Sequence, residues 1–155
     1  MDTLSLVRPT HHTQLRLTTT AATEFMDLTD RLERLAAESG IHTGLLNVQT
    51  LHTTTGILVN EAEPRLHDDF HATLARLAPL GVAYRHDDLA RRPDIGPDEP
   101  RNGHAHCRAL VLQASVCLHV VRGRLQLGRW QRVFFVELDG PREREVSIVA
   151  LGAAR

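Results

Sequence analysis

The chain has 155 residues, of which 42% are hydrophobic and 24% charged, and its formal net charge is −1. This composition is typical of one globular domain, which we expect to span residues 1–155. The balanced charge excludes the basic stripe by which proteins bind nucleic acid. No apolar run approaches the roughly 18 residues of a membrane span, and no signal-peptide core is present, so we expect a cytoplasmic protein without a membrane partner.

Lysine is absent, and all 18 basic residues are arginine. This excludes mechanisms that need a Schiff-base lysine or a phosphate-loop lysine. Any bound anion must therefore be held by arginine, backbone N–H groups, hydroxyls or a metal. The two cysteines, Cys107 and Cys117, make no disulfide framework and no zinc-ribbon pattern, and we interpret them as reduced thiols.

The first half of the chain changes from a strand pattern to a helical one. Alternating leucines within residues 4–17 predict a strand or hairpin. Apolar residues at helical spacing from Phe25 to Leu35 predict a helix, with Thr23 as its cap and Gly40 just past its end.

Two strands and a second helix are expected next. Residues 44–52 alternate as a strand, which places His52 at the end of a row that faces the core. A strand over 57–60 follows after a break, and Pro64 opens a helix that ends before Pro79.

Residues 87–101 are rich in proline and charge, and they predict a long surface loop of the kind that often carries function. A short helix after Asn102 and strands over 116–121, 130–138 and 145–151 complete the pattern. Strands and helices do not alternate strictly, which indicates an α+β fold with a mixed or antiparallel sheet.

The segment HDDFH, from His67 to His71, has the histidine spacing of a zinc-protease helix. The position of the catalytic glutamate holds Asp68, which is one methylene shorter, and the histidines lie out of phase with the apolar stripe. We interpret this segment as a half-exposed helix face.

Other polar residues leave alternatives open. His104 and His106 would point in different directions on a regular helix, so if Asn102 caps a helix here, just one of them is expected to face inward. His86 begins the acidic loop and fits either a metal ligand or a solvated loop residue. Glu137 lies on a strand that is apolar on both faces, where a carboxylate is either paired, with Arg142 or Arg144 beyond the following turn, or functional.

The order of these signals along the chain resembles the YjbQ-like family, whose members are described as secondary thiamine-phosphate synthases. The likeness rests on HTTTGILVNE (52–61), YRHDD (84–88), NGHAH (102–106) and GRLQLGRWQRVFFVELDGPRERE (123–145), and it covers nearly the whole chain. It implies a mixed, largely antiparallel sheet curved into a half-barrel around a buried helix, in a homotrimer.

Carried over position by position, the resemblance implies three kinds of site residue. The metal ligands are His52, His86 and His106; the catalytic acids are Glu61 and Asp68, with Glu137 as a further acid; the substrate-binding residues are Thr53, Thr54, Gly128, Trp130 and Gln131. The sequence departs from the family pattern in two places. Gln113 replaces a usual glycine, and Arg129 replaces a small residue before Trp130.

Three neutral imidazoles suit Zn²⁺ better than Mg²⁺, so the expected cofactor is a divalent metal, with zinc favoured. The expected function is an enzyme acting on a phosphorylated small molecule, with thiamine-phosphate synthesis as the activity that the resemblance names. Joining a pyrimidine diphosphate to a thiazole phosphate would usually call for Mg²⁺ on carboxylates, which fits a three-histidine site poorly. A metal-assisted hydrolase and a non-catalytic metal- or anion-binding trimer are the alternatives.

Overall fold

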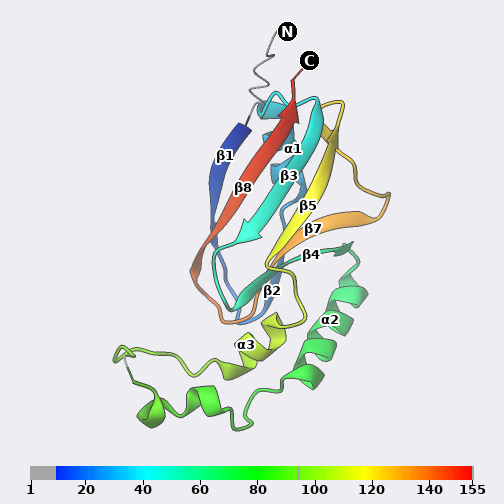
Figure 1. The fold of residues 1–155 in the computed structure, drawn as a ribbon. Helices are drawn as coiled ribbons and strands as arrows, with labels where there is room; N and C mark the ends of the chain where they lie inside the picture. Colours follow the sequence, from blue (N-terminus) through cyan, green and yellow to red (C-terminus); the bar gives the residue numbers. More distant parts are fainter. Residues whose placement is uncertain (1–9, 94, 155) are drawn as a thin grey trace.

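A computed structural model describes residues 10–93 and 95–154 of the chain (Figure 1). The predicted leucines Leu4 and Leu6 lie outside these described residues. The elements in chain order are β1 (Thr10–Thr18), β2 (Glu24–Asp27), α1 (Thr29–Glu38), β3 (Thr43–Thr50), β4 (Thr55–Glu61), α2 (Pro64–Leu77), η1 (Arg85–Asp87), η2 (Leu89–Arg91), α3 (Gly103–Ala109), β5 (Ser115–Val121), β6 (Arg124–Leu125), β7 (Gln131–Glu137) and β8 (Glu143–Ala153).

The strands form two sheets, and every strand pair in the described residues is antiparallel. A five-stranded sheet has the order β1-β8-β3-β5-β6, and a three-stranded sheet has the order β2-β7-β4. The larger sheet curves as a half-barrel with α1 behind it, while α2, α3 and the long loop lie below the sheets (Figure 1). The α+β fold class is therefore confirmed.

The main core lies between the five-stranded sheet, α1 and one face of β7. Leu32 and Ala36 of α1 are fully buried against Leu46 and Val48 of β3 and their neighbours. A helix of ten residues is marginal alone in water, so this apolar contact rather than intrinsic propensity stabilises α1.

Strand β7 is buried on both faces, as its sequence predicts. Val133 and Phe135 join the main core, whereas Phe134 and Val136 join a second cluster that contains Leu74 of α2. Successive side chains of a strand point to opposite faces, which explains this division. Glu137, the last residue of the strand, is thereby placed inside the protein with no exposed surface.

One predicted boundary is wrong. The expected helix from Thr23 begins only at Thr29, because residues 24–27 form β2, whose Phe25 pairs with Val136 of β7. Backbone pairing with β7 overrides the helical spacing of the apolar residues. The expected end is confirmed, since Gly40 follows α1 with a φ of 69°, a conformation that glycine adopts readily.

Candidate anion-binding site

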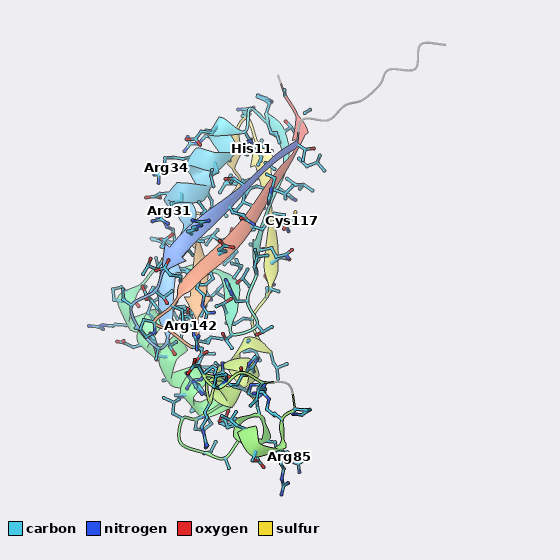
Figure 2. The ribbon with its side chains drawn as sticks, turned by 90° about the vertical axis from the view of Figure 1, so that its left-hand side faces the viewer. His11, Arg31, Arg34, Arg85, Cys117 and Arg142 are labelled. Atoms are coloured by element: carbon cyan, nitrogen blue, oxygen red, sulfur yellow. The ribbon has the colours of Figure 1, made fainter. Side chains whose placement is uncertain are left out.

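A cavity of about 350 Å³ opens where the lower ends of both sheets meet the long loop and α3. Figure 2 shows Arg142 at this junction between the sheets and the helical lower part. Four segments that are remote in sequence supply its walls. They are the β3–β4 turn, the 86–100 loop, the start of α3 and the β7–β8 turn, with the lining residues Thr53, Thr54, His86, Arg92, Glu99, Pro100, Asn102, His106, Asp139, Arg142 and Arg144.

A buried ion pair lies beneath this cavity. Arg144 Nε donates to Glu137 Oε2 at 2.7 Å, and Arg144 Nη2 donates to Glu137 Oε1 at 2.7 Å. The Thr19 hydroxyl and the backbone N–H groups of Leu138 and Asp139 also donate to this carboxylate. Burial raises the pKa of Glu137, but these hydrogen bonds and the Arg144 charge outweigh burial and hold the pKa below its ordinary value.

The pair fixes the position of Arg144 in the cavity wall. Arg144 Nη2 also donates to Thr54 Oγ1 at 3.1 Å, which ties β8 to the β3–β4 turn. The ion-pair partner of Glu137 is therefore Arg144 and not Arg142. A charged hydrogen-bond network that is fully paired is rigid, so it presents the guanidinium in one orientation.

Arg142 is held by a different acid. Its Nη2 donates to Asp139 Oδ2 at 2.9 Å, and its Nε donates to the Asp139 carbonyl at 2.7 Å. The Asn102 amide donates to the same Asp139 Oδ2 at 2.7 Å, so its side chain does not cap α3, although Asn102 occupies the cap position. Asp139 therefore joins the turn after β7 to the start of α3.

A third arginine, Arg92, forms an ion pair with Glu99 at 2.8 Å across the long loop. Its Nη1 also lies 3.4 Å from the His86 carbonyl, to which it donates. Arg92, Arg142 and Arg144 are each paired with one carboxylate. The formal charges of these three pairs cancel, so the cavity is charge-balanced rather than strongly basic.

His86 and His106 lie side by side in the cavity wall. Their ring centroids are 4.5 Å apart, with an angle of 58° between the ring planes. Burial and, after it, the neighbouring His86 lower the pKa of His106. His106 is therefore neutral at pH 7 and keeps a lone pair for a proton or a metal.

The third predicted metal ligand, His52, has a different contact. Its Nε2 accepts a hydrogen bond from the backbone N–H of Glu145 at 2.8 Å. Burial, followed by the Arg144 charge, lowers the pKa of His52, which keeps the ring a neutral acceptor. Among residues 10–93 and 95–154, no three His, Cys, Asp or Glu side chains are placed to hold an ion together. Metal binding at His52, His86 and His106 stays a prediction.

The predicted acids lie away from the cavity. Along the β4–β7 pair, Thr55 faces Glu137 at the cavity end, whereas Glu61 faces Gln131 at the other end. The six intervening residue steps, at about 3.3 Å each, separate the two ends by roughly 20 Å. Asp68 is exposed on α2 and does not line the cavity.

The predicted loop residues cluster with Glu61 at this second end. Gln131 Oε1 accepts a hydrogen bond from the Gly128 N–H at 2.8 Å, which closes the turn before β7. Trp130 is 62% exposed, and the Arg129 guanidinium lies 4.9 Å from the centroid of its ring system. Within one chain, Gly128, Trp130 and Gln131 therefore do not meet Thr53 and Thr54.

The two histidines of HDDFH are not near the cavity either. His67 packs against Phe25, Phe70 and Phe134, with ring centroids 5.2 to 5.8 Å apart, whereas His71 is exposed. This confirms the interpretation of a half-exposed helix face.

Sequence reasoning missed most of the arginine and amide residues of the cavity. Arg144 alone had a local signal, because it shares strand parity with the buried Val146, Ile148 and Ala150 of β8. An arginine in an inward-facing row needs a buried acid as its partner. Arg92, Asn102 and Asp139 carry no comparable signal, since only the folded loop brings them together.

The fold and the cavity define the class of protein: an α+β protein with two antiparallel sheets and a polar cavity where the lower ends of the two sheets meet. The model of the family described as "UPF0047 protein YjbQ-like" matches residues 13–153. The chain therefore belongs to this family. A UPF0047 protein of Archaeoglobus fulgidus is 41% identical over 138 residues, which is 89% of this chain and 99% of that one. A UPF0047 protein of Methanothermobacter thermautotrophicus is 34% identical over 139 residues, or 90% of each chain.

Solved structures give the same result. A YbjQ-like protein of unknown function from Sulfolobus solfataricus superposes with a TM-score of 0.83 at 31% identity, covering 94% of this chain and 99% of that one. A hypothetical protein from Aeropyrum pernix has a TM-score of 0.81 at 37% identity, covering 92% and 98%. None of the helices in the described part of the chain has the length and apolar character that a bilayer crossing requires.

Proposed function

We propose that the chain binds and transforms a phosphorylated small molecule in the cavity beneath the sheets. One observation carries this proposal. Arg144 is held rigidly by Glu137 and Thr54, yet neither its Nη1 nor that of Arg142 has an intramolecular hydrogen-bond acceptor in the described residues. Two guanidinium N–H edges are thus available to oxygen atoms of an anion, in a cavity that Thr53 also lines.

Pre-organisation explains why this arrangement suits a phosphate. Arginine N–H groups match phosphate oxygens in geometry, and they do so best where the side chain is already immobilised. Arg144 is buried and fixed before any ligand arrives, so binding need not order it. The absence of lysine leaves arginine as the cationic side chain for this task.

Thiamine-phosphate synthesis is the specific activity within this proposal, and it comes from the family resemblance. A pyrimidine diphosphate would lose pyrophosphate while a thiazole phosphate nitrogen forms the new C–N bond. Arg142 and Arg144 would stabilise the negative charge that develops on the leaving pyrophosphate. Thr53 and Thr54 would orient its oxygen atoms.

A zinc ion is part of the same proposal, although the structure brings together only part of the ligand set that zinc needs. His86 and His106 offer two nitrogen donors, whereas a zinc site needs at least three protein ligands. His52 would join only by leaving the Glu145 N–H. A bound metal would polarise a phosphoryl oxygen, but no step here depends on it. The homotrimer and the cytoplasmic location are proposed on the resemblance and the composition.

A phosphate-ester hydrolase is the second candidate, and His106 favours it. A neutral imidazole with a lowered pKa, beside anion-binding arginines, is suited to accept a proton from an attacking water. Incubation in ¹⁸O-water distinguishes the two reactions. A hydrolase incorporates the label into the product, whereas a synthase forms its C–N bond without it.

Calorimetric binding of inorganic pyrophosphate to the purified chain tests the shared claim. Arg142→Gln should weaken binding by on the order of tenfold or more, because a charged hydrogen bond is lost. Arg129→Gln, a charge change on the exposed Trp130 turn, is the matched control and should bind as the wild type does. Equal affinities for wild type and Arg142→Gln, or no binding by either protein, would overturn the proposal.

A further inference from the structure

Two buried side-chain atoms in the described residues have no hydrogen-bond partner, His67 Nε2 and Asn102 Oδ1. The His67 ring packs among phenylalanine rings on α2 and does not line the anion-binding cavity. Asn102 does line this cavity, and only 6% of its surface is exposed. A buried acceptor without a donor costs free energy, and folded proteins contain few of them. The unpaired oxygen of Asn102 therefore points to a donor that comes from outside the chain.

The orientation of the Asn102 amide is fixed by its neighbour. Asn102 Nδ2 donates to Asp139 Oδ2 at 2.7 Å. Asp139 also forms an ion pair with Arg142 at 2.9 Å, and a carboxylate in such a pair only accepts hydrogen bonds. The amide nitrogen must therefore face Asp139, because turning the amide over would place two oxygen atoms against each other. Oδ1 is thus an acceptor that needs its donor from another direction.

The start of α3 does not supply this donor. An asparagine that precedes a helix usually accepts a hydrogen bond from an N–H group two or three residues further on. Here the Ala105 and His106 N–H groups donate to the backbone carbonyl of Asn102, at 2.9 and 3.2 Å, and the Asn102 side chain forms no cap bond. The Gly103 N–H donates to Asp87 Oδ1 at 2.9 Å. The amide oxygen is therefore left without a donor from its own helix.

Asp139 adds a second acceptor beside the first. Its two side-chain partners, Asn102 Nδ2 and Arg142 Nη2, both donate to Oδ2. Among the described residues no donor contacts Asp139 Oδ1, and the side chain is 15% exposed. The two free oxygen atoms belong to side chains that a hydrogen bond joins. This part of the cavity wall is therefore rich in acceptors, directly beside the N–H donors of Arg142.

A hydrogen-bond donor fits these oxygen atoms better than a metal ion does. A hard cation such as Mg²⁺ or Ca²⁺ takes about six or more oxygen ligands, of which two are present here. Within 10–93 and 95–154, no three acidic, histidine or cysteine side chains surround a common point. The Arg142 guanidinium, in contact with Asp139, would also repel a divalent cation.

We propose that the ligand of this cavity carries a hydroxyl or amino group close to its phosphate, and that Asn102 Oδ1 accepts a hydrogen bond from this group. The proposal rests on the proposed function, because it takes the phosphate to bind at Arg142 and Arg144. Asn102 then determines specificity. A phosphate ester that lacks the neighbouring donor leaves the buried oxygen unpaired, and a site built to pair a polar group rejects such a ligand.

Three small phosphate esters of nearly equal size test this specificity. 2-Hydroxyethyl phosphate carries a neutral donor, 2-aminoethyl phosphate carries a charged donor, and propyl phosphate has a methyl group in the same place. Calorimetry at about pH 8 keeps the phosphate fully ionised, since its last pKa is about 6, so that the phosphate itself cannot supply the donor. We expect the wild type to bind each donor ester about tenfold or more tightly than propyl phosphate.

Asn102→Leu removes the acceptor and keeps the branched shape of the side chain. The preference for the two donor esters should fall by about tenfold, with the loss mainly in their own affinities. Asn60→Leu makes the same change on β4, outside the cavity, and is the matched control that should keep the wild-type preference. Circular dichroism checks that both variants are folded. A preference that survives in Asn102→Leu, for either donor ester, would assign it to the charge of Asp139 and overturn the proposal.

The wild-type comparison needs no variant. Equal binding of the three esters overturns the proposal even if Asn102→Leu does not fold. Pyrophosphate separates this failure from that of the proposed function. A protein that binds pyrophosphate but does not prefer the donor esters, or binds none of the three, keeps its phosphate site and contradicts the specificity assigned to Asn102. A protein that binds neither pyrophosphate nor any ester overturns both.

Discussion

Glu137 receives Arg144 through two parallel hydrogen bonds, both 2.7 Å long, and the two side chains are 0% and 8% exposed. Breaking one half of such a buried pair leaves a charge without compensation. This relationship connects the central strand of the smaller sheet with the start of strand β8, so it supports both the fold and the cavity.

Glu137→Gln should therefore destabilise the protein strongly. The amide cannot balance the buried Arg144 charge, and removal of one partner from a buried pair costs about 3–5 kcal/mol in the free energy of unfolding. Urea denaturation followed by circular dichroism measures the change. Glu61→Gln changes a half-buried acid that has no ion-pair partner in the described residues; it is the control and should change stability by less than about 0.5 kcal/mol. Similar losses for both variants would contradict the role given to the pair.

Stability should fall in acid in two stages. The pKa values of His52, His104 and His106 are lowered in the folded state, so below about pH 6.5 the unfolded chain binds more protons than the folded one. Stability then decreases as pH falls through the folded pKa values. The lowered pKa of Glu137 adds a second loss below about pH 4.5, where the unfolded carboxylate is protonated first.

His52→Gln tests the first stage. An amide oxygen can accept the Glu145 N–H, but it does not titrate, so the fall in stability below about pH 6.5 should be shallower than in the wild type. Urea midpoints across this range provide the measurement. His71→Gln changes an exposed histidine and should leave the slope unaltered. An unchanged slope for His52→Gln would show that this ring does not contribute.

The Arg92–Glu99 pair should compete with an anionic ligand. Its side chains are 27% and 28% exposed, and both line the cavity. Glu99→Gln frees the Arg92 guanidinium, so pyrophosphate should bind about three- to tenfold more tightly, with a stronger dependence on salt. Asp98→Asn removes an adjacent exposed charge and serves as the control. Equally tighter binding by both variants would indicate a general electrostatic effect of removing a negative charge rather than the release of Arg92.

Sequence patterns predicted the parts of this fold that depend on regular spacing. The two-sided burial of β7 and the helix from Pro64 are confirmed because apolar period and capping agree there. β2 was missed because four residues are too few to establish a period, and Phe25 fits a helical stripe equally well. The cavity was only partly predictable. His86 and His106 were selected through the resemblance, whereas the pairing of Arg92 with Glu99 depends on how an irregular loop folds back.

The closeness of His86 and His106 leads to a prediction about the metal content of the protein. If His86 and His106 hold zinc, elemental analysis of the purified protein should find the metal. His106→Ala and His86→Ala should each lose most of the zinc. The reason is that water cannot replace a nitrogen donor without a large loss of metal affinity. His71→Ala, an exposed histidine on α2, should retain the wild-type content. Circular dichroism establishes that each variant is folded. Equal zinc in the His86→Ala/His106→Ala double variant and in the wild type would place any metal elsewhere and leave these rings as proton acceptors beside the arginines.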